Sequence, residues 1–141
     1  HPVRMPVDAD HPLIRINEYG RGAPAINLET GYISGFRLKV KAGGSSDMSI
    51  WQDDNVVIFS NSATKTITLP GMASYFDGQI IAIVHTTSST MRVDGGGKNI
   101  IQILQNGAST VTTAESGRPE VLLFVYSHSN NCWYLTFLKS S

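Results

Sequence analysis

Charge is what this sequence has least of. Only 16% of its 141 residues are charged, against about 25% in an average soluble protein, and the formal net charge is zero. Lys and Arg are scattered singly, apart from the alternation of Arg37, Lys39 and Lys41, so the chain lacks the clustered basic surface that binding to a nucleic acid requires. Ser, Thr, Asn and Gly cover the surface instead, a composition common in extracellular and virion β-proteins.

Cysteine and long apolar runs are also scarce. The single cysteine, Cys132, excludes an internal disulfide, and its place in the apolar segment CWYLTFL predicts a buried thiol, since no cation or helix N-terminus is near it in sequence. No apolar run approaches the ~20 residues of a membrane span, so we expect no membrane insertion. The opening HPVRMPV is typical of a cut point, and we expect a fragment of a longer protein.

Short β-strand patterns occupy almost the whole chain, and no segment keeps helical periodicity for more than about one turn. In FRLKVK, the apolar side chains Phe36, Leu38 and Val40 share one face and the basic ones the other, which predicts a strand with one wet face. In TKTITLP, Ile67 and Leu69 point inward. The predicted strands are 13–17, 25–29, 33–41, 48–52, 56–60, 65–69, 79–86, 90–94, 100–105, 109–113, 120–126 and 133–138.

These strands predict an all-β fold, an antiparallel β-sandwich or jelly-roll-like knob. The runs IIAIV and VLLFVY are apolar on both sides, so we expect a second sheet or a neighbouring subunit to cover their other face. In the last strand, Trp133, Leu135 and Phe137 form the expected core face. The one helix candidate is the short SYFD turn before Gly78. We expect residues 1–12 to be an extended lead-in from a shaft and residues 13–141 to form a single head domain.

The sequence carries no legible catalytic or metal site. The GGGKN segment lacks the first glycine, the Ser or Thr and the helix of a phosphate loop, so it predicts a hairpin turn. No G-x-S-x-G nucleophile motif is present. His85 and His128 both end apolar strands, which favours hydrogen bonds at strand ends over metal ligation. Two carboxylates for glycoside hydrolysis stay possible, because their separation in space is not visible in a sequence. We expect no enzyme and no cofactor.

The combination most typical of a binding site is an aromatic ring beside carboxylate and amide groups. An indole packs on a sugar face while polar groups fix the hydroxyls, as in many glycan sites. Against this, a Trp within a strand is more often core, and adjacent acidic residues more often form a solvated turn that cannot hold calcium. The candidate ligand contacts are Trp51, Asp53, Asp54 and Asn55, with Tyr75, Phe76 and Arg92 as second choices.

The segments TKTITLPGMASYFDGQIIAIVHTTSSTMRVDGGGKNI and VLLFVYSHSNNCWYLTFL resemble a module found at the ends of bacteriophage tail fibres, tailspikes and tail needles. The resemblance covers roughly residues 64–138. It consists of the order of strands and of the turn residues between them, so it identifies no receptor-binding residue. It implies the distal, C-terminal head domain of a homotrimer in the virion tail, which binds a host cell-surface glycan or protein without a cofactor. The alternatives are a structural trimerisation cap or virion-attachment domain without a ligand and, third, an enzyme acting on a cell-wall polymer or glycan.

Overall fold

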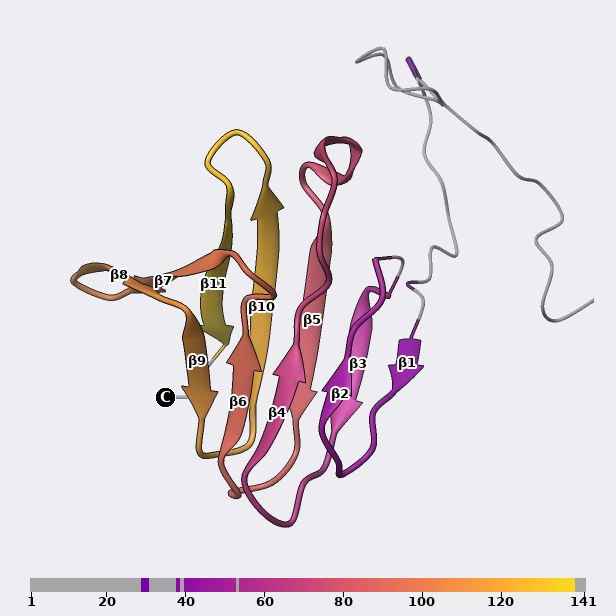
Figure 1. Ribbon diagram of the computed structural model, residues 1–141, viewed down its shortest axis with the longest axis vertical. Coiled ribbons are helices and arrows are strands. Elements are labelled where there is room, and N and C mark those ends of the chain that lie inside the picture. The colour runs from indigo at the N-terminus through magenta and orange to yellow at the C-terminus, as the bar shows by residue number, and fades with distance from the viewer. Residues whose placement is uncertain (1–28, 31–37, 39, 53, 139–141) are drawn as a thin grey trace, which may run out of the picture. The chain divides into compact units, whose positions relative to one another are not determined.

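The computed structural model describes residues 29–30, 38, 40–52 and 54–138, and nearly all of their regular structure is β-strand (Figure 1). The elements are β1 (Val40–Ala42), β2 (Met48–Ser49), β3 (Val56–Phe59), β4 (Lys65–Thr68), the 3-10 turn η1 (Ser74–Phe76), β5 (Ile80–His85), β6 (Met91–Asp94), β7 (Asn99–Leu104), β8 (Gly107–Val111), β9 (Thr113–Ser116), β10 (Glu120–Ser127) and β11 (Cys132–Leu138). Within this part of the chain, no helix is long and apolar enough to cross a membrane.

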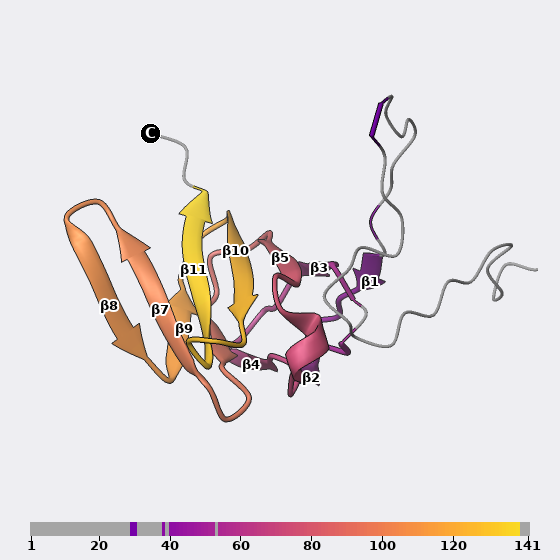
Figure 2. The same ribbon diagram turned by 90° about the horizontal axis from the view of Figure 1, so that it is seen from above.

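The strands form two sheets that pack face to face (Figures 1 and 2). The seven-stranded sheet has the order β1-β3-β5-β10-β11-β7-β8, and the four-stranded sheet has the order β2-β4-β6-β9. The β7–β8 hairpin extends away from β4 at the edge of the larger sheet (Figure 2). This arrangement confirms the predicted all-β, sandwich-like fold.

The pairing within the sheets is mixed, and the prediction of an antiparallel sandwich is wrong in this respect. From β2 to β7, each successive strand lies in the other sheet, so consecutive strands cross the sandwich instead of forming hairpins. Strands two apart in the chain therefore run parallel, as β1, β3 and β5 do in one sheet and β2, β4 and β6 in the other. Antiparallel pairing dominates only later, where β10 pairs with both β5 and β11.

The segment from β3 to β4 and the segment from β5 to β6 have the same spacing of strands and bend. Val56 pairs with Ala82 in the larger sheet and Lys65 pairs with Met91 in the smaller one, so both sheets share one offset. At the bend between the sheets, the hydroxyls of Ser60 and Thr86 lie 2.5 Å apart at that same spacing of 26 residues. The strand–bend–strand unit of β3 and β4 is therefore repeated in length by β5 and β6, although the residues of the two units differ.

The hydrophobic core lies between the two sheets and takes alternate residues from each strand. Trp133 and Leu135 are completely buried on β11, as the predicted core face requires, and Phe137 packs against the same cluster. The Trp133 ring meets Phe124 edge-on, with ring centroids 6.4 Å apart. Cys132 is buried, so the prediction of a buried thiol is confirmed.

The predicted orientation of FRLKVK is wrong where the structure describes it. Val40 is 54% exposed, whereas the Lys41 side chain is only 26% exposed. The cause is the parallel register with β3, which places Lys41 beside the buried Val57 and Val40 beside Val56 on the outward side. The Lys41 ammonium is not left without a partner on this inward side, because it donates to the carbonyl oxygen of Ser49 at 3.2 Å.

Other expected boundaries show the same partial agreement. The strands predicted from Val56 onward coincide with β3 to β7, β10 and β11, and the SYFD segment forms η1. The predicted strand 109–113 is wrong as one unit, because β8 ends at Val111 and β9 begins at Thr113 in the other sheet. The chain divides into compact units of residues 1–36 and 37–141. The predicted strands 13–17 and 25–29, most of 33–41, and the lead-in 1–12 lie outside the described residues.

Candidate functional site

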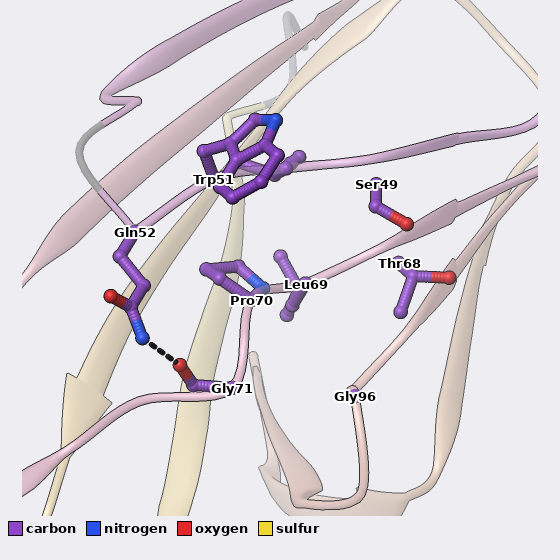
Figure 3. Close-up of a pocket in the computed structure, with 9 residues that line it drawn as sticks. Ser49, Trp51, Gln52, Thr68, Leu69, Pro70, Gly71 and Gly96 are labelled. Atoms are coloured by element: carbon purple, nitrogen blue, oxygen red, sulfur yellow. Dashed lines mark hydrogen bonds between the residues drawn. The ribbon is translucent and has the colours of Figure 1, made fainter.

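An open pocket of about 470 Å³ lies beside the ends of β2 and β4, and Trp51 forms one wall of it (Figure 3). Trp51 is 70% exposed. The general preference of a strand tryptophan for the core therefore does not hold here, because β2 ends at Ser49 and the chain has left the sheet when it reaches Trp51. An indole held in solvent beside a concavity is a surface on which a flat, partly apolar ligand can pack.

Asp54 fixes the turn that carries Trp51. Its carboxylate accepts the backbone N–H of Trp51 at 3.1 Å, and the Asp54 N–H donates to the carbonyl oxygen of Trp51 at the same distance. The Lys41 ammonium lies 3.6 Å from the same carboxylate. Asp54 is only 3% exposed, so the interpretation of this acidic pair as a solvated turn is wrong for Asp54. The carboxylate is a buried anchor that holds Trp51 outward.

The opposite wall comes from the segment after β4. The Gln52 amide donates to the carbonyl oxygen of Gly71 at 2.6 Å and so ties the Trp51 turn to this segment (Figure 3). Leu69, Pro70 and Gly96 also line the pocket. These residues are far apart in the sequence and come together through the parallel pairing of β2 with β4 and of β4 with β6.

Two hydroxyl side chains border the pocket on neighbouring strands. Ser49 and Thr68 are direct partners in the parallel register of β2 and β4, and both line the pocket. Figure 3 shows the two side chains near each other, with Leu69 between Thr68 and Pro70. Aromatic, amide and hydroxyl groups thus line one concavity, and none of the described residues that line it is charged.

Three further predicted contacts, Asn55, Phe76 and Arg92, lie away from this pocket. Asn55 donates through its amide to the carbonyl oxygen of Ile80 at 3.1 Å, which fixes the start of β3 to β5. Phe76 packs against the core, and Tyr75 belongs to η1. Arg92 pairs with Glu115 at 3.0 Å on the outward side of the four-stranded sheet. Asp53, the last of the predicted residues, lies outside the described part of the chain.

A separate polar network lies buried where β5 ends. His85 Nδ1 is 2.9 Å from the Ser116 hydroxyl, and His85 Nε2 is 2.9 Å from Asn61 Oδ1. The Asn61 amide nitrogen donates to the carbonyl oxygens of Ala63, Ser89 and Thr90, so its Oδ1 is the atom that faces the ring. His85 Nε2 therefore donates to Asn61, while the Ser116 hydroxyl beside Nδ1 donates to the Glu120 carboxylate at 2.7 Å.

This network holds the chain rather than a ligand. His85, Asn61 and Ser116 are all about 1% exposed, so a substrate cannot reach the Ser116 hydroxyl even though it hydrogen-bonds to an imidazole. Burial lowers the pKa of His85, while the Arg118 and Ser89 backbone and the Glu120 carboxylate act in the opposite direction. The predicted hydrogen-bonding role of this strand-end histidine is confirmed. His128 also hydrogen-bonds at a strand end, where its backbone N–H donates to Asp77 at 2.8 Å.

The GGGKN segment forms a turn, as predicted, but not a hairpin, because it joins β6 of the smaller sheet to β7 of the larger one. Gly96 and Gly97 have positive φ angles of 65° and 90°. In the described residues, no group of three or more His, Cys, Asp or Glu side chains is placed to hold a metal ion.

Comparison with models of known protein families and with curated proteins finds no match to this chain. The geometry of the chain itself is therefore the basis for a functional proposal.

Proposed function

We propose that this domain is the head of a trimeric viral tail fibre or needle and that it recognises a host cell-surface glycan. The observation that carries ligand recognition is Trp51, whose indole is 70% exposed beside an open pocket. Burying an exposed indole contributes favourably on binding, which makes it the natural centre of a recognition site. The resemblance to fibre-tip modules supports the virion context and the trimer.

Carbohydrate is the ligand class that this chemistry fits best. A pyranose ring offers an apolar face that stacks on an indole, and its hydroxyls hydrogen-bond to groups such as the hydroxyls of Ser49 and Thr68. Both side chains line the same pocket as Trp51. Because no described residue of the lining carries a cation that would pair with an acidic sugar, neutral sugar units fit it better than strongly acidic ones. One open site gives weak binding, and three sites on one trimer raise the avidity.

The test is binding of the full chain to an array of bacterial surface polysaccharides and oligosaccharides. We expect the unmodified chain to bind at least one of them and Trp51→Ala to weaken that binding by roughly tenfold or more. Trp51→Phe keeps an aromatic face and should retain part of the affinity. Gln105→Ala, at an exposed position in the β7–β8 turn, is the matched control and should bind normally.

Two outcomes would contradict the proposal. Undiminished binding by Trp51→Ala, with a folded protein, would place recognition elsewhere on the domain. No binding by the unmodified chain to any member of the array would favour the alternative, a structural trimerisation cap or virion-attachment domain. Circular dichroism of each variant shows whether the fold is intact.

A further inference from the structure

The seven-stranded sheet has one face in the core and a second face that no part of the described chain covers. We call this second side the outer face. The register places Ile58, Val84, Val121 and Leu138 in one row across β3, β5, β10 and β11. Ile58 and Leu138 are among the most exposed large hydrophobic residues, and Val84 and Val121 are half-buried. A soluble sheet normally turns polar side chains to its wet side, and this row has none.

The neighbouring rows repeat the same chemistry. Ala82 lies beside Leu123, and Ile80 lies beside Val125. The polar groups that these rows add on β11 are two hydroxyls, on Thr136 beside Leu123 and on Tyr134 beside Val125. None of the outward side chains of β3, β5, β10 and β11 is charged. The outer face is therefore a continuous apolar surface and not a scatter of single exposed residues.

The opposite side of the sandwich shows what a wet face of this domain looks like. On the four-stranded sheet, Thr66, Arg92 and Glu115 form one outward row, and Thr68 and Asp94 belong to the next. The two outward faces of one small domain thus differ sharply in chemistry. Charged and hydroxyl side chains occupy one, and aliphatic side chains occupy the other.

Strand β1 continues the apolar character of the outer face at the sheet edge. Its Val40 points to the outer side beside Val56, while its Lys41 points to the core side. In a domain whose outer face met only water, the opposite orientation would bury the valine and expose the ammonium. The observed orientation continues the apolar surface to the sheet edge and removes the nearest cation from it.

We infer that the outer face is the surface through which copies of this chain contact one another. Each outward side chain occupies roughly 32 Å² of sheet. Two rows cross β1, β3, β5, β10 and β11 and the third crosses β5, β10 and β11, which gives a footprint of roughly 420 Å². Two such faces together cover roughly 830 Å² of projected sheet, and the accessible surface of the side chains on it is larger, which brings the contact close to the ~1,000 Å² that a specific interface needs. Because none of the described outward side chains of this face is charged, copies meet through it without like-charge repulsion and without desolvating an ion.

This inference rests on the proposed function only for the expectation that the chain self-associates, and it is independent of the ligand. The test uses the full chain in sedimentation equilibrium over a wide concentration range. We expect a stable oligomer. Leu123→Glu, in the centre of the outer face, should weaken association by roughly 100-fold or more, because the carboxylate would be buried without a partner. The matched control, Thr66→Glu, adds the same charge beside Arg92 on the other outward face and should leave association unchanged.

Val84→Thr is a second, isosteric variant that introduces only a hydroxyl and should weaken association by roughly tenfold. It keeps the test decisive if Leu123→Glu fails to fold. An unmodified chain that stays monomeric would overturn the inference, since its outer face must then be covered by its own residues 1–36 or by a different partner. Association that withstands both outer-face variants, or that Thr66→Glu disrupts equally, would also overturn it. A closed dimer that dissociates in the outer-face variants alone would support the interface and contradict the trimeric fibre tip.

Discussion

Gly96 and Gly97 occupy the turn after β6, and only one of them is enclosed. Both have positive φ, where an L side chain is strained by roughly 1–2 kcal/mol. A Cβ on Gly96 would also overlap the carbonyl oxygen of Leu69, whereas a Cβ on Gly97 would meet nothing within 4 Å. Because Leu69 follows β4 and lines the pocket, this close approach joins β6 to the wall opposite Trp51.

We therefore expect Gly96→Ala to lower the free energy of unfolding by about 2–4 kcal/mol. Gly97→Ala has the same strain without the overlap and should lower it by only about 1 kcal/mol. Urea denaturation of both variants measures the difference. Equal losses would show that the approach of Gly96 to Leu69 contributes nothing.

Trp51 and Asp54 show which parts of a site a sequence can predict. The sequence places an indole beside carboxylate and amide groups, but in the structure Asp54 and Asn55 hydrogen-bond to the backbone while Trp51 lines the pocket. Exposure was not predictable, because it depends on β2 ending two residues before Trp51. The burial of Asp54 depends on Lys41, whose position follows from a parallel register. Gly71 and Gly96 belong to the pocket only through packing of segments that are distant in sequence.

At the scale of the element, the bends between sheets are held by the buried network around His85. Asn61 lies in the bend after β3, and its amide nitrogen donates to carbonyl oxygens in the bend after β5. Ser116 connects the ring to the end of β9 and lies 2.7 Å from the Glu120 carboxylate. The Ser116 hydroxyl donates to that carboxylate and also lies 3.1 Å from the carbonyl oxygen of Arg118, so the network reaches from β9 to β10.

Stability should fall in mild acid because burial lowers the pKa of His85 below its usual 6.5. The unfolded chain then binds a proton that the folded chain does not, so this contribution is complete above about pH 6.5 and is lost as the pH falls toward the folded-state pKa. The slope for one proton is at most about 1.4 kcal/mol per pH unit. Urea denaturation between pH 7.5 and 5 measures it.

His85→Gln removes this titration and should flatten the profile over that range, at some cost in stability at every pH. His128→Gln, at an exposed histidine in the turn after β10, is the matched control and should keep the dependence of the unmodified chain. An unchanged slope in His85→Gln would show that another group causes the loss.

The strands themselves were largely predictable, but their partners were not. Alternation and turn residues locate β4 and β5 because these signals are local. Whether β4 pairs with β5 or with β6 depends on whether the connection after β4 turns back within the same sheet or crosses to the other sheet. The bend of residues 60–64 leads from one sheet to the other, whereas a shorter turn would have made a hairpin. The wrong orientation of Val40 follows from the same cause, since only the pairing with β3 decides which side of β1 is inward.

At the scale of the whole molecule, the two outward faces make opposite predictions about salt. Arg92 and Glu115 are more than half exposed, so ions screen any association through the four-stranded sheet. Ions have no charge contacts to screen in association through the outer face. Salts such as sulfate, which are excluded from protein surfaces, strengthen the burial of apolar side chains instead. The salt dependence of self-association therefore reports which face is used, without any substitution.

We expect the dissociation constant of the oligomer to change by less than about threefold between 0.05 and 1 M sodium chloride, and to decrease in sodium sulfate at equal ionic strength. Light scattering over a dilution series in each salt measures both effects. A weakening of roughly tenfold or more in sodium chloride would indicate contacts between charged groups, which the outer face lacks. Self-association would then involve charged residues outside the outer face, such as the outward row of Arg92 and Glu115 on the four-stranded sheet.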